Sequence, residues 1–203
     1  FGSMPDCYLL NNNNGVFSKV ENKTFSKIGM VTDAVFTDFN KDGTIDIIVI
    51  GEWMKPTFFA NKNGKFTNVT ATVLPEKCNG LWQAIIPFDI DNDGDLDYMV
   101  GNWGLNSKFK ASEAFPSYYS ILGLDELAEQ FSGMIKKKFK SYKSFAGKKV
   151  EEVFSPQMLS KAKLFEVENL KSGYLKNQNG KFTFVPFSND LQVAPINSFV
   201  KWY

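Results

Sequence analysis

Two short segments of the sequence carry oxygen-bearing side chains at alternate positions, and this spacing could bind a metal ion. Both segments fit the pattern D-x-[DN]-x-D-G-x-x-D, and their equivalent carboxylates lie 51 residues apart. The first segment supplies Asp38, Asn40, Asp42, Thr44 and Asp46, and the second supplies Asp89, Asp91, Asp93, Asp95 and Asp97. Alternate residues of a tight loop point inward, so we expect the side-chain oxygens of positions 1, 3 and 5 to converge.

Calcium suits this set of ligands, since it takes about six to eight oxygen ligands at about 2.3–2.6 Å. The glycine at position 6 allows a sharp turn. Position 7 offers a backbone carbonyl, at Thr44 and Asp95, and position 9 a further carboxylate, at Asp46 and Asp97. An EF-hand has glutamate at position 12, where this sequence has valine within an apolar run. The pattern predicts two calcium sites that are not EF-hands; aspartate-rich turns without an ion are the alternative.

The loops must be positioned by the apolar runs that flank them, which we interpret as adjacent strands. A second element, Asn-Gly between aromatic-rich runs, occurs three times, at residues 14–15, 63–64 and 179–180. Asn-Gly favours a two-residue type I′ hairpin, because both turn residues need positive φ. Carboxylate loops and hairpins alternate along the N-terminal half of the chain. The expected fold is therefore dominated by β-structure, as antiparallel blades of a partial β-propeller.

A helical insertion is expected at residues 120–165. Apolar residues recur at helical spacing from Leu124 to Phe139, residues 148–154 favour a short helix, and Ser155-Pro156 is typical of a helix start. We interpret the lysines of this segment as a solvated helix face, with a basic patch as the alternative: Lys136, Lys137, Lys138, Lys140 and Lys143. Blades with two calcium loops are thus expected at 1–119, then the insertion, then a further blade at 166–203.

The composition narrows the chemistry that this chain can perform. Its 203 residues include 23 lysines and 22 acidic residues but neither arginine nor histidine. Histidine-based triads and dyads, HExxH zinc sites and arginine fingers are therefore excluded within the chain. The net charge of +1 gives no strong field for nucleic acid, and no apolar run approaches the roughly 18 residues of a membrane span. Cys7 and Cys78 allow one disulfide or none.

The segments DFNKDGTIDIIVIGEW and DIDNDGDLDYMVGNWGLNSKFKAS resemble FG-GAP/VCBS repeats, the propeller repeat of the integrin α head. The nearest likeness is to secreted VCBS-repeat proteins of Bacteroidetes, over residues 5–113 and 172–203, including Gly-x-Trp after each loop. The resemblance implies a seven-bladed propeller, structural calcium held by the residues named above, and an extracellular, cell-surface or periplasmic location. The sequence departs from the family pattern at two places. No carboxylate loop follows residues 108–112, so either this blade has lost its site or residues are absent there, and the chain ends at Tyr203, just before the expected position of a third calcium loop.

A calcium-stabilised binding or adhesion module without enzymatic activity is the function that these features favour, with a glycan or protein ligand. The predicted metal loops use all the well-spaced carboxylates, which leaves no isolated acid pair for hydrolysis. A scaffold domain of a larger surface protein and a carboxylate-dependent glycan-active enzyme are the alternatives. The tryptophans could stack on sugar rings, although packing between blades is favoured: Trp53, Trp82, Trp103 and Trp202.

Overall fold

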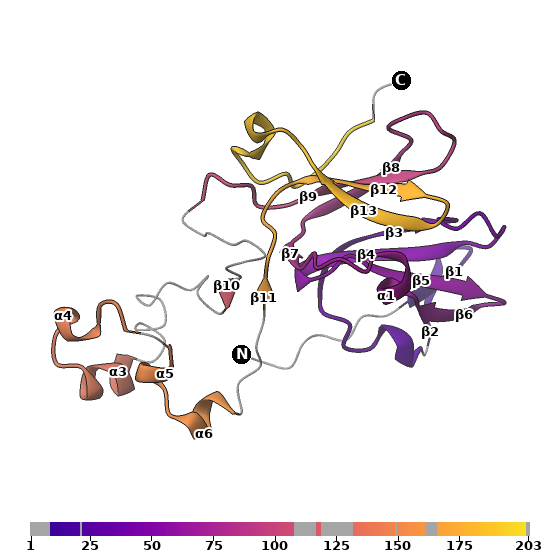
Figure 1. Ribbon diagram of the computed structural model, residues 1–203. Coiled ribbons are helices and arrows are strands. Elements are labelled where there is room, and N and C mark those ends of the chain that lie inside the picture. The colour runs from indigo at the N-terminus through magenta and orange to yellow at the C-terminus, as the bar shows by residue number, and fades with distance from the viewer. Residues whose placement is uncertain are drawn as a thin grey trace. The chain divides into compact units, whose positions relative to one another are not determined.

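The computed structural model describes residues 9–20, 22–107, 117–118, 132–148, 150–160 and 166–201. The chain divides into two compact units, one of residues 1–116 with 166–203 and the other of residues 117–165. The first unit is built mainly from antiparallel strands and carries both predicted metal loops (Figure 1). The second unit contains short helices. The expectation of a mostly β fold is therefore confirmed.

The first sheet follows the chain as an antiparallel meander of β3 (Met30–Thr37), β4 (Asp46–Met54), β5 (Thr57–Lys62) and β6 (Lys65–Asn68), and β7 (Gly80–Leu81) pairs with β4. The apolar run of β4 is buried from residue 46 to residue 51. The predicted loop connects β3 to β4, and Asn63-Gly64 connects β5 to β6. Both turn residues have positive φ, 54° and 80°, as a type I′ hairpin requires.

The second sheet repeats this arrangement with strands from two distant parts of the chain. β8 (Ala84–Phe88) and β9 (Asp97–Gly101) flank the second loop, and the sheet continues with β12 (Gly173–Gln178) and β13 (Lys181–Pro186). β12 is antiparallel to β9, with Gly173 opposite Val100. The strands found at residues 173–186, where a further blade is expected, belong to this second sheet. The hairpin of β12 and β13 forms the outer half of the second sheet. A long insertion separates it in the sequence from β8 and β9, the strand pair that it completes.

Buried polar contacts hold the segment that leaves β9 beside the segment that enters β12. Asn102 is fully buried; its side-chain amide donates to the Asn169 carbonyl (2.9 Å), and its N–H donates to the Ser172 hydroxyl oxygen (2.9 Å). The Gly104 N–H donates to the Leu170 carbonyl (2.7 Å). These groups would lose their partners if the segments separated, so the contacts close the base of the insertion and let β12 pair with β9.

The main hydrophobic core lies between the two sheets, which Figure 1 shows as neighbouring layers. Phe58 of the first sheet and Phe182 of the second have ring centroids 4.6 Å apart. Phe39, in the first loop, packs edge-on against both rings, at 5.3 Å and 6.0 Å. Phe39 is 2% exposed, so the first loop is fixed on its inner side by the core that joins the sheets.

Trp82 also belongs to this core. Its side chain is fully buried, and its indole N–H donates to the Cys78 carbonyl (3.2 Å), which supports a packing role. Cys78 is itself a buried free thiol, and burial raises its pKa to about 12; Cys7 lies outside the described residues. Of the other tryptophans, the first two are half-buried and the last lies outside the described residues: Trp53, Trp103 and Trp202.

A hairpin of β1 (Leu9–Asn13) and β2 (Val16–Val20) precedes the first sheet and turns at Asn14-Gly15. Within the described residues, the two larger sheets and this hairpin do not form a closed ring of blades. The remaining short elements of this unit are η1 (Lys23–Phe25), α1 (Thr70–Val73), β11 (Glu166–Val167) and η2 (Asn189–Gln192).

The second unit contains β10 (Ser117–Tyr118), α3 (Ser132–Lys138), α4 (Tyr142–Phe145), α5 (Val150–Val153) and α6 (Pro156–Leu159). Its small core consists of Ile135, Phe145 and Val153. Helices occur where the sequence predicts an insertion, and α6 begins at the proline expected to start a helix. The expected beginning of the first helix, at Leu124, lies outside the described residues. The five lysines interpreted above as a solvated face are exposed: Lys136, Lys137, Lys138, Lys140 and Lys143.

Candidate metal centre

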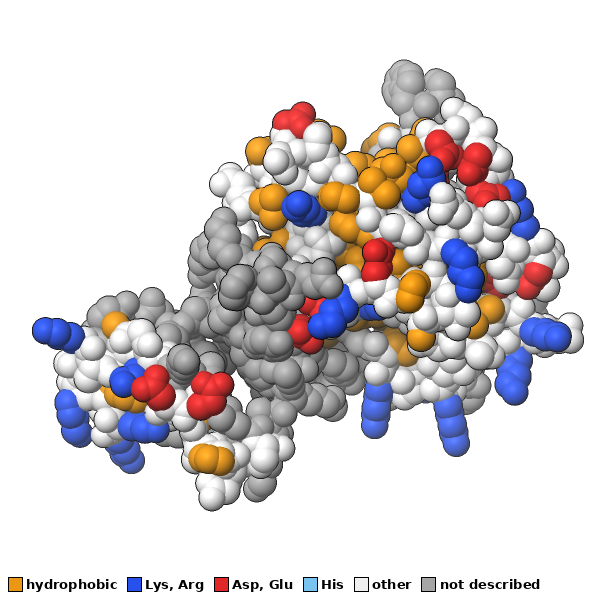
Figure 2. All heavy atoms as spheres, viewed as in Figure 1, with side chains coloured by type: hydrophobic (Ala, Val, Ile, Leu, Met, Phe, Trp, Pro, Cys, Tyr) orange, Lys and Arg blue, Asp and Glu red, His pale blue; other side chains and the backbone are white. Residues whose placement is uncertain are grey.

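The loop between β8 and β9 gathers three carboxylates into a compact cluster. Asp89, Asp91 and Asp97 each offer one oxygen, and these oxygens lie within 4.8 Å of one another. Two oxygens bound to one calcium ion at about 2.6 Å can be at most about 5.2 Å apart, so the spacing fits a single ion. Asp97 is buried and Asp91 is exposed, so the cluster has a solvent side. Figure 2 shows acidic side chains, with lysines beside them, at the end of the second sheet where this loop lies.

The same backbone turn shapes both loops. In the second loop, Asn92 and Gly94 have left-handed φ values of 57° and 86°, and the Gly94 N–H donates to Asp89 Oδ2 (3.1 Å). The equivalent residues of the first loop, Lys41 and Gly43, have φ values of 55° and 84°. A Cβ added at either glycine would meet nothing within 4 Å, so glycine is required for its φ and not for space.

Each loop contains one buried carboxylate oxygen without a hydrogen-bond donor. This atom is Asp89 Oδ1 in the second loop and Asp46 Oδ2 in the first. Asp46 is fully buried, and this burial raises its pKa. A buried carboxylate oxygen without a partner is costly, and a cation would supply the missing partner. The cluster of Asp89, Asp91 and Asp97 in the second loop therefore fits a hard cation with oxygen ligands.

An asparagine that the sequence analysis did not identify holds the carboxylate at position 9 of each loop. The Asn177 N–H donates to Asp97 Oδ1 (2.7 Å), and the Asn61 N–H donates to Asp46 Oδ1 (2.8 Å). Each asparagine side chain also donates to the carbonyl just before position 9, at 3.1 Å and 2.8 Å. Both begin an Asn-x-Asn-Gly turn, and this repeated pattern was the signal available in the sequence.

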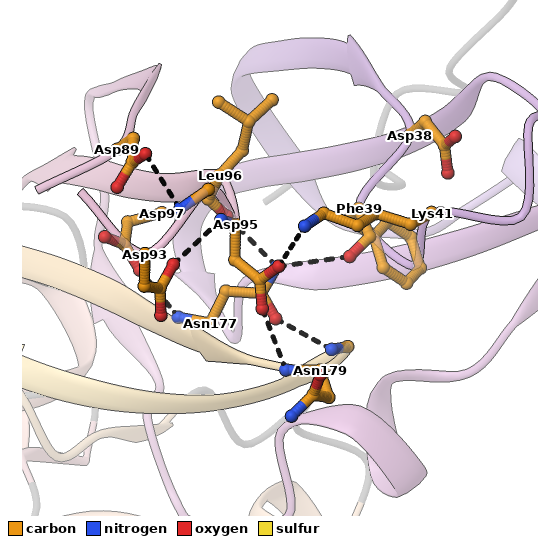
Figure 3. A network of polar contacts seen from close by, with 12 residues as sticks. Asp38, Phe39, Lys41, Asp89, Asp93, Asp95, Leu96, Asp97, Asn177 and Asn179 are labelled. Carbon is orange, nitrogen blue, oxygen red and sulfur yellow. Dashed lines mark hydrogen bonds and ion pairs between the residues drawn. The ribbon is translucent and has the colours of Figure 1, made fainter. Parts of the chain in front are cut away.

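Asp95 directs its carboxylate away from the cluster, as Figure 3 shows. It forms an ion pair with Lys41 of the first loop and accepts a hydrogen bond from the Asn179 N–H (3.1 Å). The hydrogen bond from Lys41 lowers the pKa of Asp95. The Asp95 carboxylate is therefore engaged elsewhere, and we predict that Asp95, at position 7, offers a cation only its backbone carbonyl. Asp93, also outside the compact cluster, accepts the Asp95 N–H on Oδ1 (2.8 Å).

Asp91 shares its carboxylate with a lysine of the same sheet. Lys176 Nζ, from β12, lies 2.8 Å from Asp91 Oδ2, and both side chains are about one-third exposed. The hydrogen bond from Lys176 lowers the pKa of Asp91. A cation in the cluster would therefore compete with this ammonium group for Asp91.

The first loop is arranged differently. Both oxygens of Asp38 accept backbone hydrogen bonds, from the N–H groups of Asp42 (3.1 Å) and Gly43 (2.9 Å). The hydroxyl of Thr44 donates to Asp42 Oδ1 (2.5 Å) and lowers the pKa of Asp42. Asn40 takes position 3 and donates to Asp42 Oδ2 (3.0 Å). Among the described residues, the tight cluster of three acids lies in the second loop only, so the structure shows one candidate cation site.

Comparison with known families identifies the repeat. A family model described as an FG-GAP-like repeat matches residues 3–49 and residues 38–100. The N-terminal region therefore carries FG-GAP-like repeats, and both loops fall within the matched residues. No curated protein and no solved structure matches the chain. Within the described residues, no helix combines the length and the apolar character needed to cross a membrane.

Proposed function

We propose that this chain is a calcium-stabilised binding module of the FG-GAP type, without catalytic activity, that works outside the cytoplasm and binds a glycan or a protein. Both loops hold calcium in this proposal. The second uses Asp89, Asp91, Asp93 and Asp97 with the Asp95 carbonyl, and the first uses Asp38, Asn40, Asp42 and Asp46 with the Thr44 carbonyl. The FG-GAP-like repeats of residues 3–100 support it, because such repeats are often parts of adhesive, ligand-binding domains.

The observation that carries the proposal is the carboxylate cluster with the buried, partnerless Asp89 Oδ1. Acidic residues in exposed turns occur without ions, but a buried oxygen without a donor needs a partner. The equivalent atom Asp46 Oδ2 extends the argument to the first loop, although its three acids are not gathered as tightly. Carboxylate and carbonyl oxygens without nitrogen or sulfur favour calcium over zinc or copper.

The proposed ions are structural. Each loop connects the first two strands of its sheet, and its position-9 aspartate is tied to the outer hairpin of the same sheet. A bound cation would therefore fix the two halves of a sheet to one another and neutralise acids that repel. Sites of this kind in extracellular modules bind calcium with dissociation constants of about 10⁻⁴–10⁻³ M, which suits a location rich in calcium.

The test is thermal unfolding with calcium and with a chelator. A ligand that binds only the folded state at about 100-fold excess over its dissociation constant stabilises by about 2.7 kcal/mol per site. We expect chelation to lower the melting temperature by several degrees, and calorimetry to count two sites. Identical melting curves for calcium-loaded and verified metal-free protein would overturn the proposal. A glycan array probed with calcium and with chelator then tests the class of ligand.

A further inference from the structure

One buried asparagine touches both loops (Figure 3). Asn177, in β12, is 2% exposed, and its N–H holds Asp97 Oδ1 of the second loop (2.7 Å). One hydrogen of its side-chain amide is directed to the Leu96 carbonyl of the same loop (3.1 Å). The other is directed to the Phe39 carbonyl of the first loop (3.2 Å). Phe39 directly follows Asp38, the first predicted ligand, so this one side chain connects the backbones of two cation loops.

Both polar atoms of this side chain have hydrogen-bond partners. Its two amide hydrogens go to the two loops, and its oxygen accepts from the Gly180 N–H (2.8 Å). A buried amide with every partner in place holds its neighbours firmly, because moving any of them leaves a polar group unpaired. The equivalent residue Asn61 provides a natural comparison, since these bonds stay within its own loop and sheet, with Thr44, Ile45, Asp46 and Gly64.

Two further contacts join the same pair of loops. Lys41, in the first loop, forms an ion pair with Asp95 in the second. The hydroxyls of Thr37 and Tyr98 lie 2.6 Å apart and are buried, one residue before the first loop and one residue after the second. The two loops are therefore connected at their edges as well as through Asn177. We name the contacts made by Asn177 and by the Lys41–Asp95 pair the inter-loop bridge.

We propose that the inter-loop bridge couples the two cation sites, so that an ion in one loop raises the affinity of the other. This inference rests on the proposed calcium binding. An ion that orders one loop also fixes the groups that the bridge holds in the other, so the second ion meets a loop that is already ordered. Repulsion between the two ions opposes this effect, and physiological salt weakens that repulsion.

The experiment measures the calcium affinity of the second loop by calorimetry, with the first loop intact or disabled by Asp38→Ala. Couplings of this kind are typically about 5–150-fold. We expect Asp38→Ala to lower the calcium affinity of the second loop by about fivefold, and this ratio is the coupling factor. In the Asn177→Ala background, Asp38→Ala should change the calcium affinity of the second loop by less than about twofold. Alanine keeps the backbone N–H that holds Asp97, so this variant removes only the side-chain contacts.

Asn61→Ala is the matched control. This variant removes the equivalent turn bond, from the Gly64 N–H, and the equivalent bond to the carbonyl before position 9, at Ile45. Neither bond connects the first loop to the second. In this background the fivefold effect of Asp38→Ala should persist. If Asn177→Ala does not fold, Lys41→Ala decides, because that side chain is 58% exposed and can be removed without a cavity. We expect Lys41→Ala to reduce the coupling factor, whereas Lys176→Ala, within one sheet, should leave it unchanged.

The outcomes separate the two proposals. Calcium bound by both loops with no effect of Asp38→Ala on the second loop would overturn the coupling and leave the proposed function intact. A fivefold factor that survives in folded Asn177→Ala protein, or in Lys41→Ala protein when that variant decides, would also overturn the coupling. A parent protein that binds no calcium would overturn the proposed function, and the coupling with it.

Discussion

The two loops share a sequence pattern and a backbone turn, yet they are completed in different ways. In the first, Asp46 receives its hydrogen bond from Asn61, 15 residues further on. In the second, Asp97 receives the equivalent bond from Asn177, 80 residues further on and beyond the insertion. The contacts are nearly identical although the separation differs fivefold. In both sheets, the last carboxylate of the loop is therefore held by the outer hairpin of the same sheet.

The loops also differ in how their acids are arranged without an ion. In the second, Asp89 leaves one buried oxygen without a donor and stands in a cluster of three acids. In the first, Asp38 turns both oxygens to backbone N–H groups, and Asn40 takes the place of a third acid. The first loop thus satisfies its first ligand internally, whereas the second leaves that ligand available to a cation.

Replacing the first ligand of each loop should have the largest effect and should separate the two. With saturating calcium, Asp89→Ala and Asp38→Ala should each lose the stabilisation of one site, about 2.7 kcal/mol at 100-fold excess. In metal-free protein, Asp38→Ala loses two hydrogen bonds and should cost about 1 kcal/mol. Asp89→Ala loses one hydrogen bond, from the Gly94 N–H, but it also removes a buried oxygen without a donor, so it should be nearly neutral. Urea unfolding of each variant with and without chelator measures this. Equal losses in the metal-free state would contradict the difference between the loops.

Asp46→Asn should reverse its effect on stability when calcium is removed. With calcium, the variant loses the stabilisation of one site, about 2.7 kcal/mol of unfolding free energy. In metal-free protein, it removes a buried charge whose second oxygen has no donor, so it should gain about 1 kcal/mol of unfolding free energy. Asp97→Asn is the control, because both of its oxygens have donors, the N–H groups of Asn177 and Ile90. Chemical unfolding of both variants in both states checks the reversal, and a gain in metal-free Asp97→Asn would contradict it.

The pH dependence of the metal-free protein follows from the same carboxyl. Burial raises the pKa of folded Asp46 above the ordinary 3.8, so the folded state binds this proton more readily than the unfolded state. The contribution of this group to stability should therefore increase as the pH falls from the raised pKa towards 3.8. Asp46→Asn should remove that component from the pH profile of urea unfolding, and an unchanged profile would argue against a buried, partnerless carboxylate.

Local features of this fold could be predicted from sequence, and pairing between distant segments could not. Asn-Gly at residues 14–15, 63–64 and 179–180 predicts three hairpins, and all six turn residues have positive φ. A turn is encoded by the residues that make it. Which sheet the third hairpin joins depends on contacts across the insertion, such as Asn102 with Ser172, and no sequence spacing encodes them. The roles of Asn61 and Asn177 were missed although both begin an Asn-x-Asn-Gly turn, because each acts on an aspartate of a different strand pair, which the turn pattern does not identify.

The second loop should keep its ion to a higher concentration of chelator than the first. It has Asp91 at position 3, where the first loop has Asn40, and more ligand charge generally tightens calcium binding. A single carboxylate in a partly exposed site contributes about 0.2–1 kcal/mol, so we expect a difference of about 1.4- to fivefold in affinity. Chelator titration followed by NMR of the glycines at position 6 resolves the two loops. Release from the second loop first would contradict this order.

The smallest expected effect concerns Lys176, which competes with a cation for Asp91 and has no described counterpart at Asn40 in the first loop. The pair is partly exposed, so its energy is small, at about 0.2–1 kcal/mol. Lys176→Ala should therefore tighten calcium binding by the second loop about twofold and leave the first loop unchanged. Lys136→Ala, an exposed lysine of the second unit, is the control, because it changes the net charge by the same amount. Weaker binding in Lys176→Ala would mean that the lysine positions Asp91 for the ion, and the competition argued here would be wrong.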